Sequence, residues 1–355
     1  MIPPEGTPPG DGPRSTPETS DDVAAPVVPT TEPPPAGPPG AGTFTIEGRS
    51  APALFVVGWL ATLLGLGFVL VGVLSGGTAA SPFILAIGLA VLGVGLVAGA
   101  GSQGIERRVR ARTIYRGPSP FLVFAASIPV SLLLVVIIGV PLSLLGVDVL
   151  GPAGSLAAVL VQAVVYWALV RLLVVDVGAL DWGAMGWRRF DTSALTELAG
   201  GALWAIPVIV ATIPVALVLS SLFPVEPVSP LPPAGEPVGF ALNLLAGAIV
   251  APIGEELVFR GFATTAWARD LGRRRALVQA ALFFALVHVL TIGGATAGEA
   301  FGLAVLGFAT RVPVALALGW LFLRRGSIWA PIGLHAAFNA ILLVLGEAAV
   351  RSGAV

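Results

Sequence analysis

The residues best suited to chemistry in this chain are glutamates and histidines that lie inside apolar segments. His288 and His335 are the only two histidines, and the pair Glu255-Glu256 lies in a third apolar run. An ionisable side chain at the centre of a bilayer costs roughly 2.5–3.5 kcal/mol on insertion scales, so such residues usually serve a function. These four residues mark where a functional site is expected.

Within the motif Glu255-Glu256-x-x-x-Arg260, the two glutamates are expected to have different roles. Glu256 and Arg260 are four residues apart, so they share one helix face and can form a structural ion pair. Glu255 is rotated by about 100° from that face and has no local partner. The pattern favours Glu255 as the functional carboxylate, with a second ion pair that joins helices as the alternative.

Two further motifs each place a histidine one helical turn from a second residue. Phe284 and His288 are four residues apart, as are His335 and Asn339, so each pair lies on one helix face. His335 and Asn339 can donate hydrogen bonds to one point, or His335 can bind a metal. The plainer alternatives are a histidine satisfied within the core and polar contacts that join helices.

The three motifs are expected to meet at similar depth in the membrane. At the helical rise per residue, Glu255 lies about 13 Å, and His335 about 12 Å, from the arginine-rich ends of their segments. His288 lies about 18 Å from the corresponding end of its segment. Three separate helices should therefore bring a carboxylate, two imidazoles and an amide to the same layer of the membrane.

The chemistry that this set permits is activation of water. Glu255 can take a proton from water as a general base, an imidazole opposite can orient that water, and a histidine with an asparagine can donate to an oxyanion. Alternatively, Glu255, His288 and His335 form an open zinc site with water as the fourth ligand. No cofactor beyond this one divalent metal is indicated. The chain has no cysteine that could act as a nucleophile.

Together the motifs resemble those of the CPBP family, the CAAX proteases and bacteriocin-processing enzymes that are also called ABI proteins. The resemblance covers roughly residues 240–345. It implies an all-helical intramembrane endopeptidase in which Glu255 and His288 activate water. It also implies that His335 and Asn339 stabilise the oxyanion. Members of the family have been described both as metalloproteases and as metal-independent glutamate proteases.

The composition is that of a membrane protein. Charged residues make up 11% of the chain, against about 25% in soluble domains. Runs of about 20 apolar residues recur, each long enough to cross a bilayer core of ~30 Å. The expected fold is an all-α polytopic membrane helical bundle of about eight to nine transmembrane helices. The expected spans are 51–76, 79–100, 120–146, 155–176, 197–222, 238–264, 276–293, 300–323 and 327–346.

Three regions are expected along the chain. Residues 1–49 are rich in proline and too polar to build a core, so they should form a disordered cytoplasmic tail. Residues 50–190 should hold the N-terminal transmembrane helices, and 195–347 the protease-like core. Arginines gather in alternate loops, which the positive-inside rule assigns to the cytoplasm. Nine spans then put the C-terminus outside a multi-pass protein of the cell membrane.

Two other functions stay open beside a protease that acts on a membrane-associated protein or peptide. Glutamate and histidine within spans also serve proton-coupled transporters, and a non-catalytic scaffold could keep the polar set as helix contacts. The net charge of −1 gives no sign of nucleic-acid binding. Two arginines lie within apolar runs: Arg311 is expected to pair with a carboxylate, and Arg171 to reach the interface.

Overall fold

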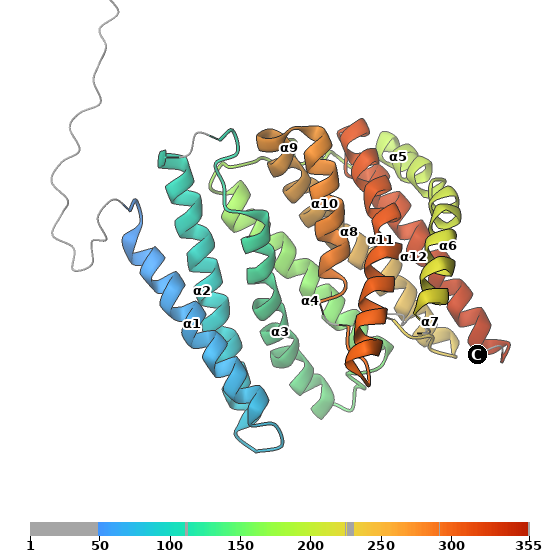
Figure 1. Ribbon diagram of the computed structural model, residues 1–355, viewed down its shortest axis with the longest axis horizontal. Helices are drawn as coiled ribbons and strands as arrows, with labels where there is room; N and C mark the ends of the chain where they lie inside the picture. Colours follow the sequence, from blue (N-terminus) through green and yellow to red (C-terminus); the bar gives the residue numbers. More distant parts are fainter. Residues whose placement is uncertain (1–48, 111–112, 224, 226–230, 291, 354–355) are drawn as a thin grey trace, which may run out of the picture. The chain divides into compact units, whose positions relative to one another are not determined.

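The computed structural model describes residues 49–353 except 111–112, 224, 226–230 and 291. The proline-rich tail expected over 1–49 therefore lies outside the described residues, apart from Arg49. The described part of the chain is built from helices and contains no β-strand (Figure 1), which confirms the all-α prediction.

Eight helices in the described part are long and apolar enough to cross a membrane. The first four are α1 (Pro52–Leu74), α2 (Ser81–Arg110), α3 (Pro120–Leu144), and α4 (Pro152–Val170) with the π-helical η1 (Arg171–Val175). The fifth is α5 (Thr192–Ala202) with α6 (Ala205–Leu222), and the last two are α11 (Ala297–Arg325) and α12 (Trp329–Arg351). The sixth, here called the composite helix, joins α7 (Pro237–Leu244), η2 (Leu245–Val250), α8 (Ala251–Glu256), η3 (Leu257–Thr264) and α9 (Thr265–Leu271).

The expected span 276–293 is not a full-length helix, which corrects that prediction. It corresponds to α10 (Arg273–Val287), which has 15 residues and ends one residue before His288. The apolar run continues past His288, but it contains two adjacent glycines that weaken a helix. Thr296 then caps the next helix, α11, by accepting a hydrogen bond from the backbone N–H of Glu299. Hydropathy alone therefore does not mark the end of this helix.

The composite helix lies at the centre of the packing. It is packed against α4 on one side and against α12 on another, while α11 contacts η3, α10, α6 and α12. The preceding helices are packed in chain order, with α1 mainly against α2, α2 against α3, and α3 against α4. The residues expected to do chemistry thus lie on α8, at the end of α10 and on α12.

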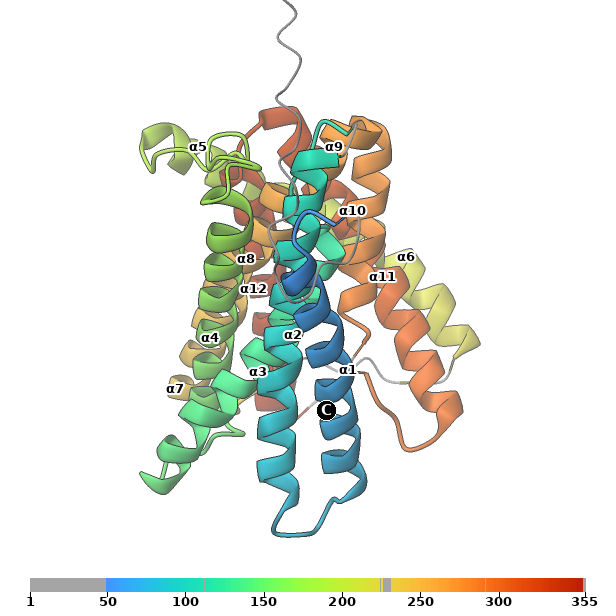
Figure 2. The same cartoon turned by 90° about the vertical axis from the view of Figure 1, so that its left-hand side faces the viewer.

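The arginine-rich connections lie at one end of the helices. In Figures 1 and 2 this end holds the α2–α3, η1–α5, α9–α10 and α11–α12 connections. The α1–α2 turn, the α3–α4 connection and the start of α7 lie at the opposite end. The loops that share a charge in the sequence therefore share an end in the structure.

A seam of glycines joins α1 and α2. In α1, Gly58, Gly65 and Gly72 are buried and seven residues apart. A Cβ atom added at Gly58 would lie 2.8 Å from the backbone nitrogen of Gly99, and one at Gly88 would lie 2.7 Å from that of Val69. Backbones this close leave no room for a side chain, which is how small residues permit helix packing in lipid.

Candidate active site

The segment that carries the two glutamates departs from regular α-helix on both sides. Only the six residues of α8, Ala251–Glu256, are α-helical between η2 and η3. Within η3, the hydroxyl of Thr264 donates to the carbonyl of Phe259, five residues earlier, at 2.7 Å. π-Helical turns are rare and occur often at functional sites. The irregular backbone and the buried carboxylates therefore both indicate a functional site in this segment.

Glu256 and Arg260, expected to pair across one helical turn, lie in direct contact. Arg260 Nη1 is 3.1 Å from Glu256 Oε1, and the two side chains are 1% and 0% exposed. Arg260 Nη2 also donates to the carbonyl of Ala315 in α11. Its guanidinium lies 4.3 Å from the ring centre of Phe284 in α10. The arginine thus joins three helices and compensates a carboxylate that has no access to solvent.

Glu256 has a second partner that the sequence did not indicate. His335 Nδ1 lies 2.8 Å from Glu256 Oε1, and the histidine side chain is 6% exposed. Glu256 therefore accepts from both Arg260 and His335, which is 79 residues further along the chain. No periodicity within one helix reveals a contact between helices at that separation. One carboxylate thereby fixes the orientation of an imidazole on α12.

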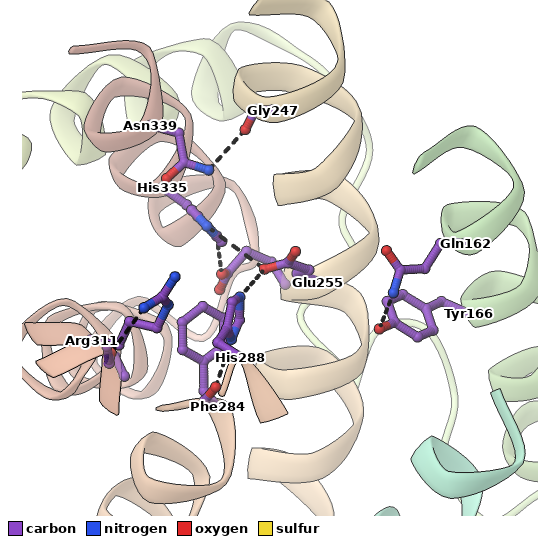
Figure 3. Close-up of polar contacts among 12 residues, drawn as sticks. Gln162, Tyr166, Gly247, Glu255, Phe284, His288, Arg311, His335 and Asn339 are labelled. Atoms are coloured by element: carbon purple, nitrogen blue, oxygen red, sulfur yellow. Dashed lines mark hydrogen bonds and ion pairs between the residues drawn. The ribbon is translucent and has the colours of Figure 1, made fainter. Parts of the chain in front are cut away.

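Glu255 faces both histidines (Figure 3). Its Oε2 atom lies 3.5 Å from His288 Nε2 and 3.8 Å from His335 Nε2. The Glu255 side chain is 17% exposed and that of His288 is 25% exposed, so this group is less enclosed than the Glu256–Arg260 pair. The structure thus brings together the three residues that the sequence assigned to separate membrane segments.

The hydrogen bonds of the two imidazoles define which ring nitrogens face Glu255. His288 Nδ1 lies 2.7 Å from the carbonyl of Phe284, which can only accept, so Nδ1 carries the hydrogen. His335 Nδ1 likewise faces the Glu256 carboxylate. In the neutral rings both Nε2 atoms then carry lone pairs toward Glu255, whose Oε2 has no hydrogen-bond donor among the described residues. Three acceptors therefore converge on one region, and a group that donates protons, such as water, fits between them.

Phe284 forms an apolar wall of this region. Its ring centre is 4.3 Å from that of His288 and 5.7 Å from that of His335. The spacing in the sequence placed Phe284 beside His288 but gave no contact with His335. The ring therefore lies against Arg260 as well as against both histidines.

Asn339 lies one turn beyond His335 on α12, as the sequence spacing requires. Its Nδ2 atom donates to the carbonyl of Gly247 in η2 at 2.8 Å (Figure 3). This bond ties α12 to the π-helical stretch that precedes the glutamates. An amide nitrogen carries two hydrogens, so one stays available after the bond to Gly247.

Two side chains near the site were not weighed as site residues from the sequence. Tyr166 in α4 is 4% exposed, accepts from Gln162 Nε2 at 3.0 Å, and lies across the composite helix from the histidines (Figure 3). Its ring lies against the position where Gly254 would carry a Cβ atom, at 3.5 Å. The absence of a side chain at Gly254 thus lets α4 approach the helix turn that carries Glu255.

Arg311 in α11 is the second of these side chains. Its Nη1 atom donates to the carbonyl of Gly307 in its own helix at 2.9 Å. Among the described residues no carboxylate lies within ion-pair distance of Arg311, so the expected pair is not a direct contact; the charge of Arg311 interacts with that of Glu255 over a longer distance. The only hint in the sequence was the presence of a cation in the middle of an apolar run.

The fold and site define a polytopic helical membrane protein with a carboxylate–histidine centre inside its helices. Residues 237–341 match a family model described as type II CAAX prenyl endopeptidase Rce1-like. The matched segment includes the glutamates, both histidines and Asn339. This match confirms the resemblance drawn from the motifs: residues 237–341 are similar to a CAAX prenyl endopeptidase family. Neither a curated protein nor a solved structure matched the chain.

Proposed function

We propose that this protein is an intramembrane endopeptidase that hydrolyses a peptide bond in a membrane-associated protein or peptide. The observation that carries the proposal is the approach of Glu255 Oε2 to the Nε2 atoms of His288 and His335, from three different helices, within the matched segment. A carboxylate and two imidazoles that all face one region suit a hydrolytic water better than they suit helix packing.

In the proposed first step, Glu255 takes a proton from water while that water adds to the scissile carbonyl carbon. The Nε2 atom of His288 accepts the second hydrogen of the water and so orients it. The electrons of the carbonyl double bond move to its oxygen, which becomes the oxyanion. In the second step the carbon–nitrogen bond breaks, and the leaving nitrogen takes the proton held by Glu255.

The oxyanion is proposed to lie on the α12 side, near His335 and Asn339. Asn339 keeps one amide hydrogen after its bond to Gly247. His335 is held by Glu256 through Nδ1, so its Nε2 atom is turned toward this region and donates to the oxyanion when it carries a hydrogen. Together they supply donors at the position where charge develops, and such donors are typically worth ~2.7–4 kcal/mol each in the transition state.

A divalent metal is the alternative activator of the water. Glu255, His288 and His335 are donor types that zinc accepts, and both histidines have an outer acceptor that would orient them as ligands. Among the described residues, no group of three or more His, Asp or Glu side chains has the arrangement of a preformed metal site. We propose the mechanism in which Glu255 itself activates the water, and metal analysis with chelation tests the alternative.

The proposed orientation places the arginine-rich end in the cytoplasm, together with the N-terminal segment, in the cell membrane. Its support is the gathering of the charged loops at one end of the helices. Substrate would then reach the site from the cytoplasmic half of the bilayer. The family match supports a protein substrate, and the anchor of a lipid-modified substrate would lie in the same membrane as the enzyme.

The test uses purified protein in liposomes with a fluorogenic peptide that carries a C-terminal lipid-modified cysteine. Wild type should cleave the peptide, Glu255→Gln should not, and Glu299→Gln should behave as wild type. Glu299 is a matched control because it lies in the exposed first turn of α11, away from the histidines. Proton uptake into the liposomes without cleavage would support a transporter instead, and neither activity would support a scaffold.

A further inference from the structure

Arg311 is a cation in the middle of a membrane-spanning helix. It is the central residue of the 29-residue α11, and its side chain is half-buried. Its position corresponds to about 21 Å from either helix end, close to the bilayer midplane. A cation at that depth is costly and is usually kept for function.

The surroundings of Arg311 provide no direct ion pair for its charge among the described residues. The guanidinium has five N–H donors, and the structure pairs one nitrogen with the carbonyl of Gly307. The space beside that nitrogen is lined by the apolar side chains of Val289 and Ile292, from the segment that follows His288. Among the described residues Arg311 has neither an ion pair nor a second hydrogen bond. Most of its donors are therefore free to meet a ligand.

The guanidinium is directed toward the catalytic group. Figure 3 shows Arg311 on the side of Phe284 and His335; one guanidinium nitrogen is bonded back to its own helix, and the other terminal nitrogen points toward these residues. It also interacts electrostatically with the Glu255 carboxylate. The free donors thus point into the region where the proposed reaction takes place.

The other donors around this region are largely committed. His288 Nδ1 is bound to the Phe284 carbonyl, and one amide hydrogen of Asn339 to the Gly247 carbonyl. Arg260, the other buried cation, is 1% exposed and is held by Glu256 and the carbonyl of Ala315. Of the cations near the site in the described residues, Arg311 is the one whose donors can reach a substrate.

We propose that Arg311 is a further catalytic residue that donates a charge-assisted hydrogen bond to the oxyanion. This inference rests on the proposed protease function. Glu255, Glu256 and Arg260 together carry one negative charge, which moves from Glu255 to the substrate oxygen as the water is deprotonated. A fixed cation beside that path stabilises the charge where it arrives, and hydrogen bonds from a cation are about twice as strong as neutral ones.

The test compares Arg311→Gln and Arg311→Lys with wild type in the liposome cleavage assay. Removing one oxyanion donor typically lowers kcat by about 10²–10³-fold, and we expect this for Arg311→Gln with KM changed by less than about twofold. Arg311→Lys keeps the charge but loses the planar fork, so it should recover a large part of kcat. Arg171→Gln is the matched control, because Arg171 lies in η1 with its side chain 49% exposed and paired with Asp176.

Folded yield and melting temperature are measured for each variant, so that rates refer to folded protein. A rise in KM with unchanged kcat would overturn the proposal and make Arg311 an anchor for a substrate anion. Unchanged kinetics for Arg311→Gln, or a lysine variant no better than glutamine, would also overturn it. If folded wild-type protein cleaves no peptide, the proposed protease function itself is wrong. That result differs from a failure of the Arg311 proposal, in which wild type cleaves the peptide and the Arg311 variants do not behave as expected.

Discussion

The α1–α2 seam and the composite helix are both tightly packed, but they use opposite means. In the seam, Gly58, Gly65 and Gly72 let two backbones approach where lipid offers no hydrophobic drive. Around the composite helix, Glu256 and Arg260 are fully buried and hold three helices by charge. The seam joins its helices by close backbone packing and one hydrogen bond, from Ser81 to the carbonyl of Gly72. The composite helix joins its neighbours through charged groups that also orient a histidine.

The two regions differ in where the molecule buries charged side chains. Burying an ion pair rarely adds stability over a well-packed apolar contact, because each charge must lose its water. The seam lies outside the segment that matches the protease family, and the ion pair lies inside it. Charge is therefore buried where it positions His335 beside Glu255, and glycine is sufficient where helices only pack.

The largest expected effect comes from breaking the buried ion pair. Arg260→Ala leaves Glu256 buried without its cation and should cost ~3–5 kcal/mol of stability. The measurement is the free energy of unfolding in detergent, together with folded yield. Arg171→Ala is the matched control, because Arg171 pairs with Asp176 and the two side chains are 49% and 44% exposed. It should lower the free energy of unfolding by no more than ~1 kcal/mol.

A double variant sharpens that prediction. Replacing both partners, as in Glu256→Gln with Arg260→Met, removes the unpaired charge and should recover most of the lost stability. Its cleavage rate should nevertheless stay low, because Glu256 also orients His335. If Arg260→Ala and the double variant lost the same stability, the unpaired charge would not be the cause of the loss. That result would contradict the view that the ion pair serves mainly to position the site.

The next expected effect is in the seam. Gly65→Ala adds a methyl group where the backbone of Leu92 lies against the glycine, and overpacking should cost ~1–3 kcal/mol. Gly67→Ala makes the same change in the same helix at a position with no atom within 4 Å, and should be neutral or slightly stabilising. Melting temperature measures the difference. Activity per folded molecule should be unchanged in both, and a selective loss in Gly65→Ala would tie the seam to the site.

The smallest expected effect is that of metal removal. The proposed mechanism uses Glu255 itself as the base, so we expect protein treated with a strong chelator to keep its cleavage rate within about twofold of untreated protein. Metal content is measured on the same active sample. Stoichiometric zinc, with activity lost on chelation and restored by zinc alone, would replace the metal-independent mechanism and make Glu255, His288 and His335 ligands.

Much of the fold could be predicted because hydropathy and arginine distribution act over whole segments. The end of α10 at His288 could not, since the apolar run continues past it and only two glycines and a capping threonine oppose a helix. The π-helical turns beside Glu255 also leave no mark in composition. Hydropathy reports which segments prefer lipid, but it does not report where a helix within such a segment stops.

The convergence of Glu255, His288 and His335 followed from depth along three helices, because the helical rise is nearly constant. The partners within the site did not follow. The contact of Glu256 with His335 and the bond of Asn339 to Gly247 depend on how helices are rotated and spaced. Arg311 was expected to pair with a carboxylate, and only the packed structure shows that no described carboxylate contacts it directly.

The measurement that tests the central claim most directly is cleavage of the liposome-bound peptide in ¹⁸O-labelled water, with products analysed by mass spectrometry. If Glu255 activates water, wild type and Glu299→Gln should give a new carboxylate that contains ¹⁸O. Folded Glu255→Gln should form product at least about 10²-fold more slowly, as expected for loss of a general base. Product formed by folded Glu255→Gln at the wild-type rate, or product that lacks ¹⁸O, would contradict hydrolysis by water activated at Glu255.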